Sequence, residues 1–199
     1  MASSFIAIDS ASDETLVRCV ARKDERAMRI LFARHQRRVF LFLIRVVKDE
    51  PLAEDVVNEV FLDVWRKAES FREQSAVSTW LFAIARHKAL SALGRRSEVG
   101  LDEQMAATLV DPEADPERAL QEKDRSKALG QCLAQLSPEH GQIINLVYYR
   151  EKSIREVAEI VGVPEPTVKT RMFYARRRIA ELMREQGASQ WQTTDIRAA

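Results

Sequence analysis

The segment SIREVAEIVGVPEPTVKTRMFYARRRIAEL, residues 153–182, decides the fold class. Ser153 is followed three residues later by Glu156, a capping-box pattern that marks the start of a helix. Apolar residues then recur at spacings of three and four until Gly162, where the pattern stops, and a second helix begins shortly afterwards. A short capped helix, a glycine turn and a closely following helix are typical of a helix-turn-helix.

The second helix of this segment carries five basic residues between Lys169 and Arg178 and no acidic one. On a helical wheel, its apolar side chains form one inward stripe made of Val168, Met172, Ala175, Ile179 and either Leu182 or Met183. The side chains that face outward are Thr170, Phe173, Tyr174 and Arg177. A basic helix is often only a solvated face, but the second helix of a helix-turn-helix enters the major groove, so duplex DNA is the expected partner.

The whole chain has the composition of an all-α protein. It has 199 residues, of which 31% are charged, with six Gly and six Pro, and no sustained alternation of apolar and polar residues. No apolar run is long enough to span a membrane, and the N-terminus lacks the pattern of a secretory signal. We therefore expect a cytoplasmic protein built of helices.

The distribution of charge along the chain predicts two small helical domains joined by a flexible acidic linker. Residues 97–114 contain five acidic side chains and no basic one, together with a proline and weak periodicity. The predicted domains are residues 1–96 and 115–186, and residues 187–199 form a tail without helical periodicity. Within the second domain, Asp115-Pro116 and Ser137-Pro138 are further signals for helix starts.

A helix in the first domain presents acids instead of bases. In PLAEDVVNEVFLDVWRK, residues 51–67, a broad apolar face lies opposite a row formed by Asp55, Glu59 and Asp63, with Leu62 beside them. Phosphates would repel this row, so it suits a basic protein partner, and Leu62 resembles an apolar anchor inside a polar rim. The alternative is an acidic face that only keeps the helix solvated.

A second helix of the first domain mixes apolar, aromatic and basic residues. Residues 78–96, STWLFAIARHKALSALGRR, are apolar around much of the circumference but include Arg86, His87 and Lys88. Phe71, Trp80 and Phe82 are close to these bases in sequence, a mixture that suits unstacked bases and phosphates of single-stranded DNA. The alternative is a buried helix with a basic rim.

No pattern in the sequence indicates catalysis. Cys19 and Cys132 are far apart and are expected to be buried free thiols, and the three histidines are scattered. No phosphate-binding loop, metal-ligand spacing or carboxylate constellation occurs. We predict no catalytic residue, no metal ligand and no cofactor, and hence no enzyme.

Two blocks of the sequence resemble the extracytoplasmic-function group of bacterial sigma factors, the small specificity subunits of RNA polymerase. LAEDVVNEVFLDVW and STWLFAIARHKAL are similar to the first domain of that family. LSPEHGQIINLVYYREKSIREVAEIVGVPEPTVKTRMFYARRRI is similar to its last domain. The blocks occur in the family's order, separated by a variable linker, and the likeness spans almost the whole chain.

The resemblance implies three functional surfaces. The acidic helix would bind the clamp helices of the largest polymerase subunit through Asp55, Asn58, Glu59 and Leu62. The minus-ten promoter element would be read and opened by Phe71, Ser78, Thr79, Trp80, Arg86, His87 and Lys88, with the loop 71–79 lining a pocket for a flipped base. The minus-thirty-five element would be read by Thr167, Lys169, Thr170, Arg171, Phe173, Tyr174 and Arg177.

The resemblance also implies partners and a role. The partners would be core RNA polymerase, promoter DNA and an anti-sigma factor, and the role would be transcription initiation, as in a stress response. Two alternatives stay open at this point. One is a stand-alone helix-turn-helix repressor or activator, which would bind a palindrome as a dimer. The other is an enzyme acting on nucleic acid, which would require clustered carboxylates or His and Cys ligands.

Overall fold

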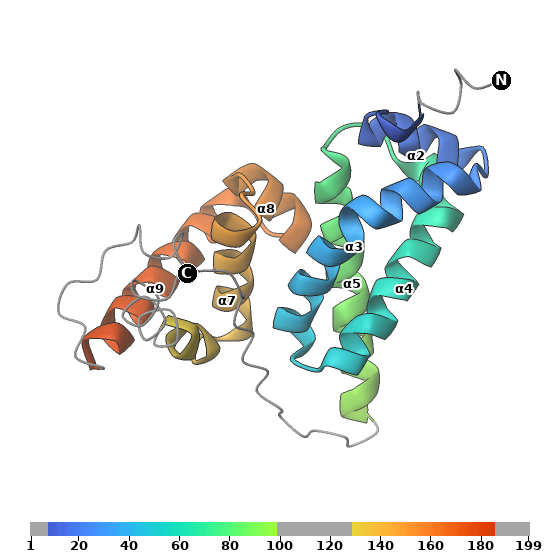
Figure 1. Ribbon diagram of the computed structural model, residues 1–199. Helices are drawn as coiled ribbons and strands as arrows, with labels where there is room; N and C mark the ends of the chain where they lie inside the picture. Colours follow the sequence, from blue (N-terminus) through green and yellow to red (C-terminus); the bar gives the residue numbers. More distant parts are fainter. Residues whose placement is uncertain (1–7, 99–128, 186–199) are drawn as a thin grey trace, which may run out of the picture. The chain divides into compact units, whose positions relative to one another are not determined.

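The computed structural model describes residues 8–98 and 129–185 and, within these ranges, consists of helices and turns without a β-strand. The chain divides into two compact units, one containing the described N-terminal residues and the other most of the described C-terminal ones (Figure 1). The all-α prediction is confirmed. Of the predicted linker 97–114, only the first two residues are described, and the tail 187–199 and the Asp115-Pro116 helix start lie outside the described residues.

The first unit is a bundle of helices joined by short connections. Its elements are α2 (Asp13–Ala21), α3 (Glu25–Val47), α4 (Glu50–Lys67), the short 3₁₀ helix η1 (Ala68–Ser70) and α5 (Val77–Glu98). Side chains of Ser12, Asp24 and Asp49 accept hydrogen bonds from backbone N–H groups in the first turns of α2, α3 and α4. The last helix continues two residues beyond the domain boundary predicted at residue 96.

Aliphatic and aromatic side chains fill the core of the first unit. Phe42 of α3 is fully buried and its ring lies 5.2 Å from that of Phe82 of α5, centroid to centroid. On α4 the predicted apolar face is buried as a whole: Val56, Val57, Val60, Phe61 and Val64. Burial of this face fixes the rotation of α4 about its axis and so decides which of its side chains reach the surface.

The helix α2 is fastened to α3 by charged side chains. Asp13 Oδ2 lies 2.6 Å from Nε2 of the buried His35, and Arg34 Nη1 donates to Asp13 Oδ1 at 2.9 Å. Burial raises the pKa of Asp13, but the hydrogen bonds and charges of Arg34 and His35 outweigh it and hold the pKa below its usual value. The ionised carboxylate is therefore part of the folded structure.

The second unit contains the helix-turn-helix. Its elements are α7 (Pro138–Ile144), a π-helical segment η2 (Asn145–Tyr149), α8 (Ile154–Val161) and α9 (Glu165–Glu185), and residues 129–134 are also helical. Ser137 caps α7, and Ser153 and Glu156 form the predicted capping box of α8. The turn after α8 has Gly162 at φ +70°, a left-handed conformation that glycine adopts without a steric penalty.

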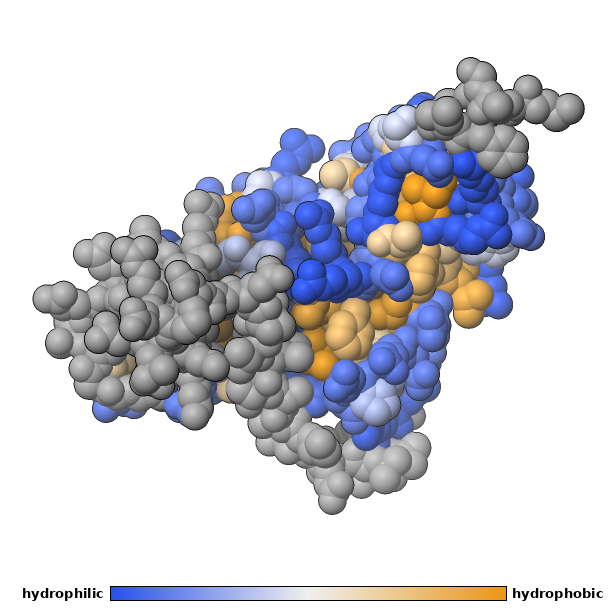
Figure 2. All heavy atoms as spheres, in the orientation of Figure 1, coloured by the Kyte–Doolittle hydropathy of each residue, from blue (hydrophilic) through white to orange (hydrophobic). Residues whose placement is uncertain are grey.

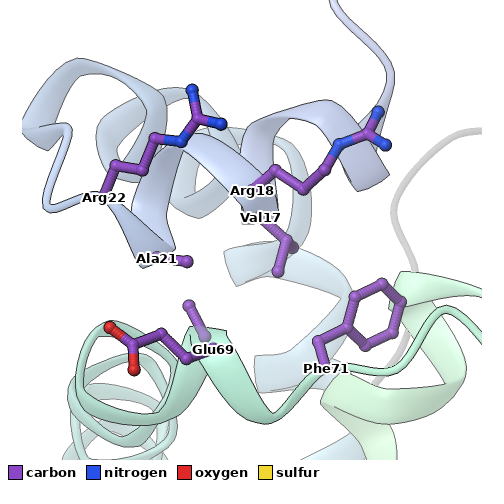
Figure 3. Close-up of a pocket in the computed structure, with 7 residues that line it drawn as sticks. Val17, Arg18, Ala21, Arg22, Glu69 and Phe71 are labelled. Atoms are coloured by element: carbon purple, nitrogen blue, oxygen red, sulfur yellow. The ribbon is translucent and has the colours of Figure 1, made fainter.

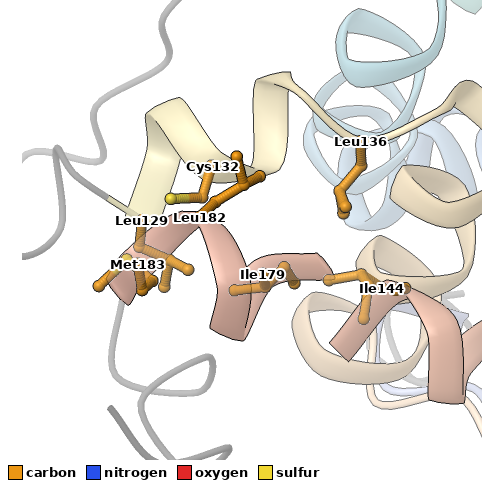
Figure 4. Close-up of a cluster of buried hydrophobic side chains, with 8 residues drawn as sticks. Leu129, Cys132, Leu136, Ile144, Ile179, Leu182 and Met183 are labelled. Carbon is orange, nitrogen blue, oxygen red and sulfur yellow. The ribbon is translucent and has the colours of Figure 1, made fainter. Parts of the chain in front are cut away.

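The core of the second unit is built around the inner face of α9 (Figure 4). Buried residues of α9 pack with side chains from α7 and the 129–136 segment in a cluster of Leu129, Cys132, Leu136, Ile144, Ala175, Ile179, Leu182 and Met183. Val168 is also fully buried, whereas Met172 is half-buried. The inward stripe predicted for this helix is confirmed, and it forces the opposite side of α9 into solvent.

The surface of the described residues is largely hydrophilic. Figure 2 shows mostly hydrophilic side chains on the visible face of the described residues, with small apolar patches among them. Four large apolar side chains among the described residues are clearly exposed, namely Leu62, Leu90, Phe173 and Tyr174. Three of them, Leu62, Phe173 and Tyr174, lie in surfaces that the sequence analysis predicts to bind a partner.

Candidate functional site

The exposed side of α4 carries the predicted polymerase-binding residues. Asp55 and Asn58 are exposed, Glu59 is half-exposed, and Leu62 has 52% of its surface accessible. We call these four residues the acidic surface. An apolar side chain among polar and anionic neighbours has the composition of an interface centre with a polar rim.

Asp63 does not belong to this surface, although the sequence placed it in the same row. Only 14% of its side chain is exposed, and its carboxylate binds Lys67 Nζ at 2.9 Å and Lys88 Nζ at 3.3 Å. The hydrogen bond from Lys67, followed by the hydrogen bond and charge of Lys88, lowers the pKa of Asp63 against the effect of burial. Of the predicted row of three carboxylates, Asp63 is therefore the one that is largely covered.

Basic side chains of α5 neutralise part of α4 along the line where the two helices pack. Glu59 binds Lys88 Nζ at 3.5 Å and Arg95 Nη2 at 3.4 Å, through different carboxylate oxygens. Arg96 Nη1 lies 2.7 Å from Asp49 Oδ2, the cap of α4. Sequence reasoning missed these pairs because their members are 29 to 47 residues apart along the chain, which no local pattern reveals.

The predicted minus-ten residues are only partly available at the surface. Phe71 and Trp80 are half-buried, with ring centroids 5.1 Å apart, while His87 is exposed and Ser78 and Arg86 are half-buried. Thr79 is fully buried, at 0% exposure, so its side chain is not accessible to DNA in this structure. Its side chain points inward from the first turn of α5. The helical wheel of this segment does not predict this orientation, because apolar residues occur around much of its circumference.

A pocket of about 310 Å³ lies beside Phe71, between α2 and η1 (Figure 3). Its lining residues are Val17, Arg18, Ala21, Arg22, Ala68, Glu69 and Phe71. Figure 3 shows the Phe71 ring next to Val17 and the side chains of Arg18 and Arg22 along the α2 side. An aromatic ring and small aliphatic groups could hold an unstacked base, whereas the carboxylate of Glu69 would oppose a phosphate in the pocket.

The outer side of α9 is basic and aromatic, as the wheel predicted. Lys169, Thr170 and Arg177 are exposed, and Phe173 and Tyr174 are exposed to 57% and 52%. The two rings contact each other edge to face, with centroids 5.5 Å apart. Large aromatic surfaces left in water beside cations are typical of a binding face rather than of a merely solvated one.

Several cations of α9 already have carboxylate partners. Arg171 Nη2 binds Oε2 of Glu139, in the first turn of α7, at 2.9 Å. Arg177 Nε binds Glu181 Oε1 at 3.1 Å, a hydrogen bond that lowers the pKa of Glu181. Thr167 is half-buried in the first turn. Lys169 makes no ion pair with the described residues, so it is the most accessible charge for a phosphate or a base edge.

Side chains that could hold a metal ion do not come together in the described parts of the chain. No group of three His, Cys, Asp or Glu residues is arranged for that purpose there. Both cysteines are free: Cys132 is buried, which raises the pKa of its thiol, while Cys19 is half-buried and not fully buried as predicted. None of the helices between residues 8–98 and 129–185 has the length and apolar character needed to cross a membrane.

Comparison with known families identifies both halves of the chain. Residues 31–99 match the family Sigma-70 region 2, and residues 126–179 match the family Sigma-70, region 4. The first match covers α4 and α5, and the second covers α7, α8 and most of α9. The acidic surface and the basic face of α9 therefore lie within the two matched regions.

Curated relatives are similar along nearly their whole length. The chain is 30% identical over 177 residues to RNA polymerase sigma-H factor of Pseudomonas aeruginosa, covering 84% of the chain and 91% of the relative. It is 31% identical over 166 residues to ECF RNA polymerase sigma factor SigL of Mycobacterium tuberculosis, covering 81% and 92%. With ECF RNA polymerase sigma-E factor of Haemophilus influenzae it shares 31% identity over 181 residues, covering 86% and 95%.

Solved structures share the fold. The sigma factor RpoE of Bartonella quintana, in complex with the anti-sigma factor NepR, is 25% identical, with a TM-score of 0.63 over 77% of this chain and 94% of that one. CnrH, in complex with the cytosolic domain of CnrY, has a TM-score of 0.64 over 88% of this chain and 99% of that one. At 20% identity, CnrH supports the fold alone.

Proposed function

Since the chain belongs to the extracytoplasmic-function group of sigma-70 family RNA polymerase sigma factors, we propose that the acidic surface binds the core enzyme and that both helical units contact the promoter. The protein is a transcription initiation factor whose partners are core RNA polymerase and promoter DNA. Sigma factors are not enzymes in themselves, and the catalytic chemistry belongs to the polymerase.

The acidic surface is proposed to receive a basic helical segment of the polymerase. Asp55 and Glu59 would pair with cations of the partner, and Leu62 would enter an apolar site between them. The same carboxylates would repel DNA phosphates, so this face of the first unit would bind protein and not DNA. The buried valines of α4 support this role because they hold the acids in solvent.

The minus-ten element is proposed to bind along the start of α5 and the loop before it. Phe71 and Trp80 would stack with unpaired bases, and Arg86, His87 and Lys88 would lie near the strand backbone. The pocket beside Phe71 supports a site for one unstacked base, because the Phe71 ring forms part of its wall. Thr79 has no direct part in this site because it is buried.

The minus-thirty-five element is proposed to bind the outer face of α9 in the major groove. Lys169 and Arg171 suit guanine edges or phosphates, and the rings of Phe173 and Tyr174 suit thymine methyl groups.

Residues 1–96 and 115–186 are proposed as the two functional domains, with residues 97–114 as their linker. We place the protein in the cytoplasm, where promoter DNA and polymerase are found.

An anti-sigma factor is a further proposed partner. The Bartonella relative was solved with the anti-sigma factor NepR, which makes a sequestering partner a reasonable expectation for this chain. Its test is recovery of a stable complex with a purified anti-sigma protein from the same organism.

One observation carries the proposal: two matched regions of one chain expose charges of opposite sign on separate helices. Asp55→Arg together with Glu59→Arg should abolish association with core polymerase in size-exclusion chromatography, and run-off transcription should be lost with it. Lys169→Ala together with Arg171→Ala should leave association intact and remove selectivity among promoter fragments.

A matched control separates surface chemistry from total charge. Glu25→Arg with Glu159→Arg changes the net charge by the same amount, at two exposed positions outside all three proposed surfaces. This control should bind core polymerase as the parent chain does. Unchanged core binding by the Asp55 and Glu59 variant would show that the docking surface is assigned wrongly.

A further inference from the structure

An ion pair joins two helices of the second unit at the face proposed to read the minus-thirty-five element. Arg171 Nη2 on α9 lies 2.9 Å from Oε2 of Glu139 on α7. The other cations assigned to this face differ, since Arg177 pairs with Glu181 of its own helix and Lys169 makes no ion pair with the described residues. Within the described part of the chain, Arg171 is therefore the one cation of this face that a different helix holds.

The backbone around Glu139 is fixed at both ends of α7. Ser137 Oγ accepts the backbone N–H of His140 at 3.4 Å, which caps the first turn, the turn that carries Glu139. Farther along α7, Ile144 belongs to the same buried cluster as Ile179 of α9 (Figure 4). A capped turn and a buried contact together hold Glu139 in place beside α9.

The pair restricts the orientation of the Arg171 guanidinium group. The side chain of Arg171 is 24% exposed and that of Glu139 is 64% exposed, so the arginine is the more covered member. A guanidinium group is planar and carries five N–H donors in a fixed fork, and this contact engages only one of its nitrogens. A fork held in one orientation can direct its remaining donors at the O6 and N7 acceptors of a guanine.

The charge of Glu139 affects the two kinds of DNA contact differently. A phosphate carries a full negative charge, so the carboxylate repels it and reduces the attraction of Arg171 for DNA of any sequence. A guanine edge has no net charge, so the same carboxylate opposes it less. Glu139 therefore weakens mainly the contact that carries no sequence information and leaves the one that does.

From this geometry we infer that Glu139 is a specificity-determining residue. Its ion pair with Arg171 lowers the affinity of the α9 face for DNA of any sequence and increases discrimination at the base pair that Arg171 contacts. The inference rests on the proposed contact of Arg171 with the minus-thirty-five element. Glu139 acts as a positioning residue, because its effect is exerted through Arg171 and not through a contact of its own with DNA.

The test measures affinity and discrimination separately, at one salt concentration. Affinity for a duplex of random sequence is measured with the free full-length chain. Discrimination is measured with the chain assembled on core polymerase, by comparing a promoter fragment that this complex retains with variants in which each G·C pair of the minus-thirty-five element is replaced in turn.

Glu139→Gln removes the charge at an exposed position, where the change should not impair folding. It should raise the affinity for the random duplex about twofold to fivefold, the effect of one exposed ion pair, and lower the discrimination at one G·C pair by a similar factor. Failure of either change overturns the inference.

Glu181→Gln is the matched control. Glu181 binds Arg177 of the same helix at 3.1 Å, so this variant also removes one acidic charge beside a cation of the α9 face. It should leave discrimination at the base pair contacted by Arg171 unchanged. An equal loss at that base pair with Glu181→Gln would mean that the net charge around α9, and not the contact with Arg171, is responsible, and the inference would be wrong.

Arg171→Ala separates the inference from the proposed function. It should abolish discrimination at the same G·C pair that Glu139→Gln affects, and the double variant should show no further loss. If Arg171→Ala abolishes discrimination there while Glu139→Gln leaves it unchanged, the inference is refuted and the DNA contact of Arg171 stands. If Arg171→Ala changes discrimination at no base pair, the proposed contact fails and the inference fails with it. A further loss in the double variant would show that Glu139 acts independently of Arg171, which also refutes the inference.

Discussion

Asp13 is a single residue on which the attachment of α2 depends. Its carboxylate contacts the buried His35 and the guanidinium of Arg34, and together these hold its pKa below the usual value. A carboxylate with a lowered pKa in the folded state binds a proton less readily there than in the unfolded chain. Its contribution to stability is therefore complete above the unfolded pKa, near 4, and is lost as the pH falls through the folded value.

Asp13→Asn should lower the free energy of unfolding at pH 7 by about 1.5–3 kcal/mol, the range for hydrogen bonds to charged groups. Urea denaturation of the parent and the variant at pH 7 and at pH 3 measures this difference. The difference should shrink as the pH falls below about 4, because the parent then loses the same charge. A difference that is equal at both pH values would contradict the assigned role of the ionised carboxylate.

Phe42 shows how much a single core residue contributes to the stability of the first unit. It is fully buried and packs against Phe82, so Phe42→Ala removes apolar contacts and leaves a cavity. The expected loss of stability is about 3–5 kcal/mol, measured by thermal or urea unfolding. Leu62→Ala is the control: because Leu62 is exposed, its truncation should change stability by less than about 0.5 kcal/mol while weakening core binding.

Exposure of single residues was predictable where a helix has one clear apolar stripe. The burial of Val168 and Ile179 leaves Phe173 and Tyr174 no place except the surface. The inward position of Thr79 was not predictable, because apolar residues occur around much of α5. The partners of Asp63 and Glu59 were also hidden, since a salt bridge between helices depends on packing and not on local spacing.

Among the helices, α8 is the one whose start and end depend most on neighbouring residues in the sequence. Ser153 Oγ accepts the backbone N–H of Glu156, and the Glu156 carboxylate accepts the backbone N–H of Ser153. These hydrogen bonds fix the first turn and, through the Gly162 turn, the start of α9. The sequence predicted this element well because all of its determinants lie within ten residues.

Ser153→Ala should lower the stability of the second unit by about 1 kcal/mol, as removal of a capping hydroxyl usually does. Hydrogen exchange of the α8 amides measures the change directly. Ser153→Asp, which keeps a capping oxygen, should retain most of the protection. Equal loss in both variants would show that the cap does not determine the start of α8.

Other elements could not be predicted from local signals. The capped start of α7 follows from Ser137-Pro138, but its continuation as a π-helical segment over Asn145–Tyr149 has no sequence signature that we recognise. The short helix α2 was not singled out either, although it provides one wall of the pocket beside Phe71. Such features depend on contacts between distant segments.

At the scale of the whole molecule, the surfaces proposed to bind the polymerase and to bind the minus-thirty-five element lie on separate helices. The first unit exposes acids on α4, and the second exposes bases and aromatic rings on α9. Segment charge and helix signals predicted two helical domains, and the division into two compact units agrees with that organisation. A modular protein of this kind gains promoter affinity when a larger partner holds both DNA-binding surfaces in place, since linked contacts reinforce each other.

The dependence of site selection on the polymerase tests this account most directly. Fragments of the source genome are incubated with the purified chain alone and with the chain assembled on core polymerase, and the retained fragments are sequenced. The account predicts that the assembled complex retains a defined set of fragments sharing two spaced elements, while the chain alone retains DNA weakly and without preference. Retention of the same set, with the same affinity, by the chain alone would contradict it.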